Sequence, residues 1–176
     1  MPDEFIMKIC SVGSYRVGKT SLFKRYAENK FSSNYLPTLG VDVTVKRLVV
    51  DNQRIRLVLM DTAGQEQFGR LRKVYYEGSS GCIAVYSVID EESFKSLDRW
   101  ITDYRAVAGE DTHIIIVGNK IDLKDLRVVS NDEGRKFAQK QGFPFRECSA
   151  KVGGEVIPAI FIDLIHQRLT SIKESH

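Results

Sequence analysis

The first residues whose types and spacing could do chemistry form a glycine-containing octet near the N-terminus. The pattern G-x-x-x-x-G-K-[ST] is met by Gly13-Ser14-Tyr15-Arg16-Val17-Gly18-Lys19-Thr20, and Ser21 follows it. Glycines let such a loop curl until successive N–H groups face a polyphosphate, and a helix that begins there adds partial positive charge. We expect Lys19 to neutralise the outer phosphates and the Thr20 hydroxyl to bind Mg²⁺.

A second polar group comes directly after the apolar segment 57–60. It reads Asp61-Thr62-Ala63-Gly64-Gln65-Glu66. Asp61 is expected beside the phosphate loop, where its carboxylate can hold the metal through water. The Gly64 amide can approach a γ-phosphate because no side chain blocks it. Phosphoryl transfer depends on positioning and charge stabilisation, so Gln65, as the residue that orients the attacking water, and Lys19 are the candidate catalytic residues.

The phosphate loop alone fits ATPases, nucleoside kinases and GTPases equally, and a third segment discriminates among them. Asn119-Lys120-Ile121-Asp122 follows the apolar run 114–117. The Asp122 carboxylate can accept both the N1–H and the exocyclic N–H of guanine, a pair of donors that adenine lacks. We expect Lys120 to lie along the base and Asn119 to tie this loop to the phosphate loop.

A fourth segment completes the expected base site. Ser149-Ala150-Lys151 follows the last apolar segment of strand length and can offer backbone N–H groups to the guanine O6. Taken together in this order, the four segments indicate a site for GTP or GDP with Mg²⁺.

Strand-length and helix-length segments alternate along the chain and would place these motifs at one edge of a sheet. The expected strands are 5–12, 41–45, 55–59, 81–87, 113–117 and 145–148, and 51–53 carries turn residues between the second and third. That pair predicts the one antiparallel hairpin. Strands joined through helices pair in parallel, so the expected fold is an open, doubly wound α/β sandwich with ligands at the carboxyl ends of its strands.

The helices are predicted from apolar spacing and from capping residues. A helix is expected over 19–29 and another begins at Asp90. The capping-box spacing of 130–133 opens a fourth helix, and a fifth covers 155–170, with Pro158 in its first turn. Core packing is the expected role of the apolar stripe Phe94, Leu97, Trp100, Ile101 and Tyr104, rather than a partner surface.

Composition sets the broad class. A chain of 176 residues with 43% hydrophobic residues fits one domain over 1–176. Its 26 basic and 23 acidic residues are spread along the chain, which argues against nucleic-acid binding. Cys10, Cys82 and Cys148 lie in or beside apolar runs and are expected to be free thiols in a reducing compartment. With no apolar stretch of about 18 residues, a cytoplasmic location is expected.

The motifs together resemble the Ras superfamily of small GTPases, in order from about Met7 to Leu169. The resemblance is greatest to the Rab branch at 38–42, 61–66 and 75–78. It implies a three-layer P-loop G domain with a six-stranded sheet and five helices that hydrolyses GTP to GDP and phosphate. It also implies two segments that change with the nucleotide, switch I around 31–40 and switch II around 64–77. Exchange factors, activating proteins and effectors in membrane trafficking or signalling would bind there.

The same resemblance assigns three further roles in switch I. Thr38 would bind Mg²⁺ together with Thr20 and Asp61 and would sense the γ-phosphate. Phe31 would cover the guanine edge, and Tyr35 would close over the phosphates.

Three features depart from the family pattern. Tyr15 and Arg16 stand where relatives carry small residues, and bulk beside the γ-phosphate predicts slow hydrolysis.

The second departure concerns partner recognition. Val43 and Met60 stand where Rab proteins carry aromatic residues that their partners recognise, so that only Tyr75 or Tyr76 remains of that aromatic set. The end of the sequence, 171–176, has no cysteine for prenylation. Either the chain is truncated or it does not use that anchor, so peripheral membrane association stays open. A monomer is the default expectation.

Two alternatives to a GTP-hydrolysing switch come from other classes. Tyr15 and Arg16 suggest a scaffold that binds GTP with little or no hydrolysis, whereas the presence of Gln65 and Thr38 favours the switch. A P-loop nucleoside kinase would need an acceptor pocket and an arginine-rich lid insertion, and neither is found in the sequence.

Overall fold

A six-stranded sheet forms the centre of the protein. The computed structural model describes residues 4–34, 36–64 and 69–175. Within them the sheet has the order β2-β3-β1-β4-β5-β6, and β2 is its antiparallel member. The bounds are β1 Phe5–Val12, β2 Val41–Val50, β3 Gln53–Thr62, β4 Gly81–Ser87, β5 His113–Asn119 and β6 Phe145–Glu147. The expected six-stranded, mostly parallel sheet is confirmed.

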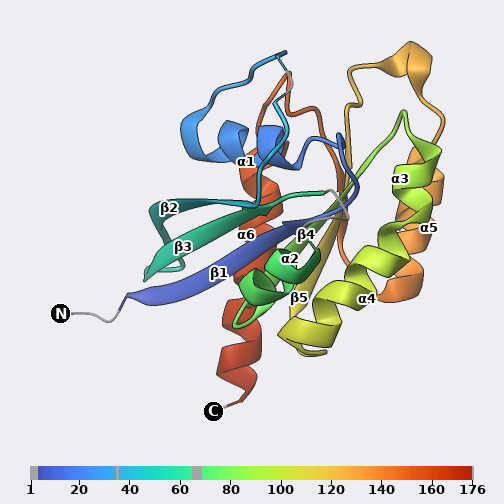
Figure 1. The fold of residues 1–176 in the computed structure, drawn as a ribbon. Helices are drawn as coiled ribbons and strands as arrows, with labels where there is room; N and C mark the ends of the chain where they lie inside the picture. The colour runs from blue at the N-terminus through green and yellow to red at the C-terminus, as the bar shows by residue number, and fades with distance from the viewer. Residues whose placement is uncertain (1–3, 35, 65–68, 176) are drawn as a thin grey trace.

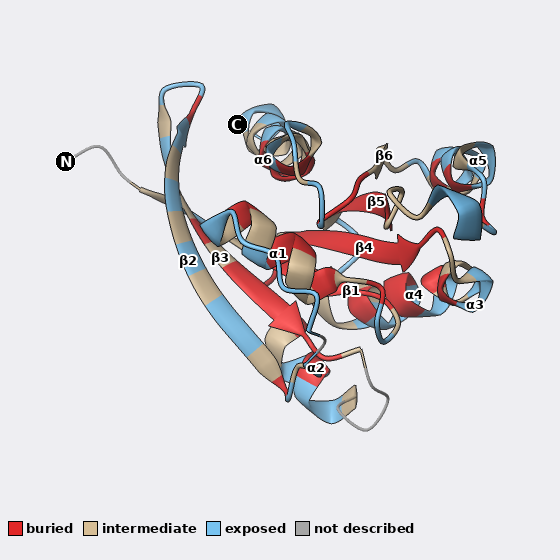
Figure 2. Ribbon diagram, turned by 90° about the horizontal axis from the view of Figure 1, so that it is seen from above, coloured by how far each residue is buried: buried red, intermediate tan, exposed pale blue. Residues whose placement is uncertain are grey.

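Helices cover both faces of this sheet (Figures 1 and 2). Their bounds are α1 Lys19–Glu28, α2 Gly69–Tyr76, α3 Glu91–Lys95, α4 Leu97–Ala108, α5 Asn131–Gln141 and α6 Val156–Glu174, with a short 3₁₀ turn at Lys124–Leu126. Ser96 alone separates α3 from α4. Counted together they are the single helix expected from Asp90 onward, which gives the five helices of the expected fold within the described part of the chain.

The hairpin between β2 and β3 turns on two residues in the left-handed region. Asp51 has φ 51° and Asn52 has φ 63°, as a type I′ turn requires, and Asn and Asp tolerate that conformation better than most residues. Ten residue pairs follow, from Val50 opposite Gln53 to Val41 opposite Thr62. The turn therefore fixes the register that carries Asp61 to the end of β3.

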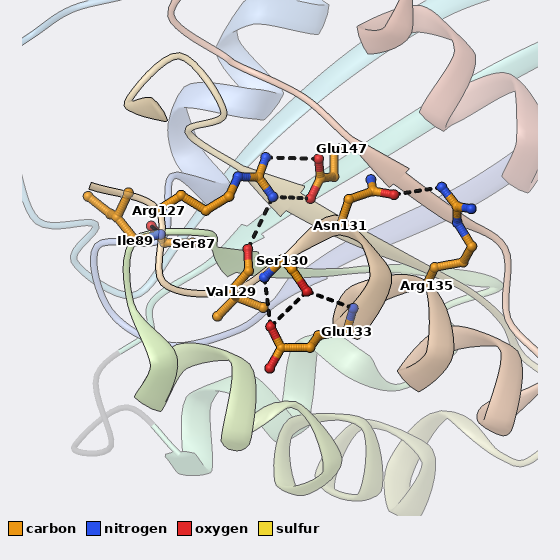
Figure 3. Close-up of polar contacts among 9 residues, drawn as sticks. All are labelled: Ser87, Ile89, Arg127, Val129, Ser130, Asn131, Glu133, Arg135 and Glu147. Carbon is orange, nitrogen blue, oxygen red and sulfur yellow. Dashed lines mark hydrogen bonds and ion pairs between the residues drawn. The ribbon is translucent and has the colours of Figure 1, made fainter. Parts of the chain in front are cut away.

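Side-chain caps fix where two of the helices begin. The Asp90 carboxylate accepts a hydrogen bond from the Ser93 N–H at 3.2 Å. The Ser130 hydroxyl accepts from the Glu133 N–H at 3.1 Å while the Glu133 carboxylate accepts from the Ser130 N–H at 2.7 Å (Figure 3). The predicted capping box at 130–133 is confirmed.

Two hydrophobic clusters fill the spaces between the layers. One joins α1 and α6 to one face of the sheet, and the other joins α2 and α4 to the opposite face, where Leu97, Trp100, Ile101 and Tyr104 are buried as expected. All three cysteines are buried thiols. No helix in the described residues is long and apolar enough to cross a membrane.

An aromatic stack joins α1 to α6 in the first cluster. The Phe161 ring is fully buried, lies 3.7 Å from the centroid of Tyr26 in a parallel stack and packs against Phe23 at 5.6 Å. Replacing Phe161 with alanine should lower the free energy of unfolding by about 3 to 5 kcal/mol, because it leaves a cavity that α1 and α6 cannot close.

Denaturant unfolding of the two proteins measures this loss. Val49→Ala is the control, since Val49 is 66% exposed and its loss should cost less than about 0.5 kcal/mol. A Phe161→Ala variant as stable as Val49→Ala would contradict the role given to the stack.

Candidate functional site

The predicted site residues meet around one cavity at the carboxyl ends of the strands. The cavity has a volume of about 840 Å³. Those that line it are Tyr15, Arg16, Gly18, Lys19, Thr20, Ser21, Phe31, Thr38, Gly64, Asn119, Lys120, Asp122, Ala150 and Lys151. Gly13, Ser14, Val17, Asp61 and Ser149 lie in the same loops and strand ends. Tyr35 and Gln65 lie outside the described residues.

The phosphate loop between β1 and α1 needs glycine at both of its fixed positions. Gly13 has φ 139° and Gly18 has φ 98°, values that side chains rarely adopt. A Cβ atom at Gly13 would lie 2.2 Å from the Val85 carbonyl oxygen, and one at Gly18 would lie 2.2 Å from the Asn119 amide nitrogen. The two glycines of the motif therefore allow the phosphate loop to pack closely against the ends of β4 and β5.

Lys19 is held inside this loop. Its Nζ donates to the carbonyl oxygens of Gly13 and Ser14, both at 2.8 Å, and the residue is 6% exposed. Burial lowers the pKa of the Lys19 ammonium to about 8, and the nearby Asp61 only partly opposes this shift. A buried ammonium with two neutral carbonyl partners is suited to receive negative charge from a ligand.

Three oxygen-bearing side chains meet at the other side of the loop. The Thr20 hydroxyl donates to the Asp61 carboxylate, and the Thr38 hydroxyl oxygen lies 2.6 Å from the Thr20 oxygen and 3.5 Å from the same carboxylate oxygen. The Ser11 hydroxyl donates to the second oxygen of Asp61 at 3.1 Å. Burial raises the pKa of the Asp61 carboxyl, although the hydrogen bond from Thr20 and the charge of Lys19 oppose the shift.

This oxygen cluster fits Mg²⁺. Hydroxyl and carboxylate oxygens are the hard ligands that this ion prefers, and one carboxylate is enough where phosphate and water oxygens complete the shell. Within the described residues, no group of three His, Cys, Asp or Glu residues is placed to hold a metal. A candidate magnesium site of two threonines and one carboxylate contains too few acidic residues to be found as a cluster, and it is found from the sequence motif instead.

Asn119 joins the base loop to the phosphate loop, as the sequence predicts. The residue is 2% exposed, its Nδ2 donates to the Val17 carbonyl oxygen at 3.0 Å, and its Oδ1 accepts from the Ala150 N–H at 3.0 Å. Lys120 adds a second link, because its Nζ donates to the Arg16 carbonyl oxygen at 2.7 Å. The Asn119 side chain thus connects the end of β5 to the loops that follow β1 and β6.

Asp122 is oriented by the segment that follows β6. Its Oδ1 accepts from the Ser149 hydroxyl at 2.7 Å, and the Ser149 oxygen accepts from the Val152 N–H at 3.0 Å. Phe31, which is 37% exposed, lines the same cavity. The carboxylate and the Ser149–Lys151 backbone are therefore held as one unit.

A bidentate ion pair supports this end of the site from outside (Figure 3). The Arg127 guanidinium donates to both carboxylate oxygens of Glu147, at 2.8 and 3.0 Å, and to the Val129 carbonyl oxygen at 3.1 Å. Arg127 follows the base loop and Glu147 ends β6, just before Ser149. The pair links the two segments that hold the predicted base contacts, with the geometry typical of strong arginine–carboxylate bonds.

Sequence reasoning missed Arg25, which lies on α1. Its Nε donates to the Ala150 carbonyl oxygen at 2.8 Å and an Nη donates to the Lys151 carbonyl oxygen at 2.6 Å. The guanidinium thereby fixes the loop whose N–H groups were expected to face the base. Its partners are backbone carbonyls 125 and 126 residues away, so no spacing in the sequence could have indicated it.

The fold and the site together define an α/β P-loop domain. A glycine-containing loop with Lys19 and Thr20 follows β1, the Thr20, Thr38 and Asp61 oxygens lie beside it, and an asparagine-lysine-x-aspartate loop after β5 lines the same cavity.

Comparison with known proteins identifies the family. A Ras family model matches residues 8–170. Rab-11B of Dictyostelium discoideum is 43% identical over 147 residues, and human Rab-3A is 39% identical over 148; each alignment covers 84% of this chain and 67% of the relative. Rab-3 of Caenorhabditis elegans is 37% identical over 177 residues, covering 99% of this chain and 80% of the relative. The chain belongs to the Ras family of small GTPases, whose members hydrolyse GTP.

The buried Lys19 predicts a pH dependence of stability in the nucleotide-free protein. Its pKa is about 8 in the folded chain against 10.5 as the ordinary value. Between these values the unfolded chain keeps the proton and the folded chain has lost it, so the Lys19 contribution to the free energy of unfolding rises with pH. The rise should reach about 1.4 kcal/mol per pH unit.

Denaturant unfolding at pH 8, 9 and 10, compared with a Lys19→Met variant, isolates this contribution. The parent should gain stability relative to the variant across the series. Parallel pH profiles for the two proteins would show that Lys19 is not held in a site that destabilises its charge.

Proposed function

We propose that this chain is a guanine-nucleotide switch that binds GTP or GDP with Mg²⁺ and hydrolyses GTP to GDP and phosphate. The observation that carries the proposal is one cavity that is lined both by Lys19 and Thr20 of the phosphate loop and by Asp122 of the loop after β5. A ligand that contacts both loops needs phosphates and a base that offers two adjacent N–H donors. Guanine nucleotides have both.

At the phosphate end, Lys19 binds the outer phosphates and the Gly64 N–H binds the γ-phosphate. Thr20, Thr38 and Asp61 hold Mg²⁺, which neutralises charge on the phosphates when it is bound. Gln65 orients the attacking water and Tyr35 closes over the phosphates. Support comes from the close packing of Gly64, where a Cβ would lie 2.4 Å from the Lys19 Nζ and 2.8 Å from the Tyr15 nitrogen.

At the base end, the Asp122 carboxylate accepts two hydrogen bonds from guanine and the Lys151 N–H donates to its O6, because the Ala150 N–H already donates to the Asn119 amide oxygen. Lys120 lies along the ring and Phe31 covers its edge. The bond from Ser149 to Asp122 supports this assignment because it holds the carboxylate in one orientation before the base arrives.

Switching follows from contacts that only GTP makes. Thr38 in switch I and Gly64 in switch II both lie at the phosphate end, so loss of the γ-phosphate releases both segments. Exchange factors, activating proteins and effectors would recognise that conformational change. We place this role in trafficking or signalling, with the protein cytoplasmic or peripheral on a membrane. On β2, Val43 is 51% exposed and pairs with Met60, so aromatic-dependent recognition by Rab partners is not part of the proposal.

Replacing Asp122 with asparagine should change the base that the protein selects. The asparagine oxygen can still accept N1–H, but its NH₂ group faces the 2-amino group of guanine and can instead donate to the 2-oxygen of xanthine. Competition binding should show GDP affinity reduced on the order of 10²-fold or more and XDP affinity raised, with ATP excluded by the parent. An Asp122→Asn variant that still preferred GDP would contradict the role of Asp122.

Replacing Tyr15 with glycine should accelerate hydrolysis. Tyr15 lines the cavity, and its ring lies 5.2 Å from the Arg16 guanidinium carbon, beside the place proposed for the γ-phosphate. An arginine from an activating protein contributes about 10³ to 10⁵ in rate in this reaction class, and bulk at this position would block its entry.

Single-turnover hydrolysis of bound GTP measures the effect of Tyr15, alone and with an activating protein. Tyr15→Gly should be faster than the parent by about tenfold, or about 1.4 kcal/mol in barrier. Tyr15→Phe keeps the bulk and should match the parent. Equal rates for all three would leave the slow-turnover hypothesis without support.

A further inference from the structure

The peptide that joins Ala63 to Gly64 is held from outside the cavity. The peptide before it is anchored at the end of switch I, because the Ala63 N–H donates to the Gly40 carbonyl oxygen at 2.9 Å. The Ala63 carbonyl oxygen accepts from Nη1 of Arg72 at 3.1 Å. On the cavity side, Gly64 approaches the phosphate loop so closely that a Cβ would lie 2.8 Å from the Tyr15 nitrogen.

Arg72 comes from α2 and is 7% exposed. Its guanidinium carbon lies 4.6 Å from the centroid of the Trp100 ring, a distance at which a cation is attracted to the face of an indole. The Trp100 indole N–H donates to the Ser14 hydroxyl at 3.2 Å, and the Ser96 hydroxyl lies 2.7 Å from the same oxygen. A continuous set of contacts thus runs from the Ala63 carbonyl through Arg72 and Trp100 to the phosphate loop.

The direction of the Gly64 N–H follows from this arrangement. In a planar trans peptide the C=O and the N–H point to opposite sides, so fixing the Ala63 oxygen fixes the Gly64 N–H as well. A hydrogen bond from a guanidinium is charge-assisted, and in a buried setting it is stronger than one from a neutral donor. The bond from Arg72 therefore orients the Ala63 carbonyl away from the cavity and the Gly64 N–H toward it.

We propose that Arg72 is a positioning residue, braced by Trp100, that holds the Ala63–Gly64 peptide with its N–H toward the γ-phosphate. The proposal rests on the function proposed above and deepens it, because it names the residue that directs one of the two contacts by which the site distinguishes GTP from GDP. GDP has no group at that position. Loss of the Arg72 guanidinium therefore weakens binding and hydrolysis of GTP while GDP binding stays the same.

The test compares Arg72→Met with the parent and with Arg105→Met. Methionine keeps most of the buried stem of Arg72 and removes the guanidinium. Arg105 is a matched control, since its guanidinium also lies over an aromatic ring, that of Phe143 at 4.9 Å, but on the part of α4 distant from the cavity. Three quantities are measured for each: the affinities for GDP and for a non-hydrolysable GTP analogue, single-turnover hydrolysis, and emission of the single tryptophan.

Arg72→Met should lose about tenfold in affinity for the GTP analogue and about tenfold in hydrolysis, with GDP affinity within about twofold of the parent. The emission change of Trp100 between the GDP and analogue complexes should shrink, because the nearer of the two guanidinium groups over its ring is gone while that of Arg99, at 5.7 Å, remains. Arg105→Met should keep the parent's ratio of affinities. If Arg72→Met does not fold, Arg72→Lys is tested by the same ratio of GDP affinity to GTP-analogue affinity. It should show the same selective loss, since an ammonium lacks the planar group that spans Trp100 and the Ala63 carbonyl.

Equal losses for GDP and the analogue, or no loss for either, would overturn the role of Arg72. A parent that binds neither nucleotide would instead overturn the proposed function, so the two failures are distinguishable.

Discussion

The buried amide of Asn119 is the constraint on which the site depends. Its nitrogen donates to the loop after β1, its oxygen accepts from the loop after β6, and the residue itself ends β5. Gly18 must lack a side chain because the amide nitrogen occupies that space. A parallel sheet brings the carboxyl ends of its strands to one edge, and this one side chain makes three of those ends a single rigid frame.

Two buried charged groups beside that frame, Lys19 and Asp61, are only partly stabilised by their neighbours in the protein. Burial lowers the pKa of Lys19 and raises the pKa of Asp61, so each charge costs more than its neighbours return. Phosphate oxygens beside the ammonium and a cation beside the carboxylate would stabilise both charged forms. In the proposed function, binding energy from such groups would stabilise the segment around Thr38, which would be the physical basis for a switch that depends on its nucleotide.

The sequence was sufficient for features set by local chemistry and less so for those set by distant contacts. The capping box at Ser130, the phosphate-loop glycines and a hairpin turn within 51–53 follow from residue type and spacing alone, whereas the type I′ geometry and the place of Gln53 in β3 were not predicted. The break at Ser96 between α3 and α4 was not predicted, because the apolar stripe continues through it. Arg25 and Trp100 were not recognised as site residues, since their partners are groups far away along the chain. Arg72 was not recognised because its partner is a backbone carbonyl, to which no residue type in the sequence points. Nothing in the described structure tests the roles predicted for Tyr35 and Gln65.

The most direct test of the account is the identity and fate of the nucleotide that the purified protein carries. The nucleotide is released and identified by chromatography, and the protein is then loaded with GTP and followed through a single turnover with and without Mg²⁺. The account predicts a guanine nucleotide and slow phosphate release that requires Mg²⁺. An adenine nucleotide would contradict the base site around Asp122, and a guanine nucleotide with no phosphate release over many hours would contradict the switch and favour a scaffold that only holds GTP.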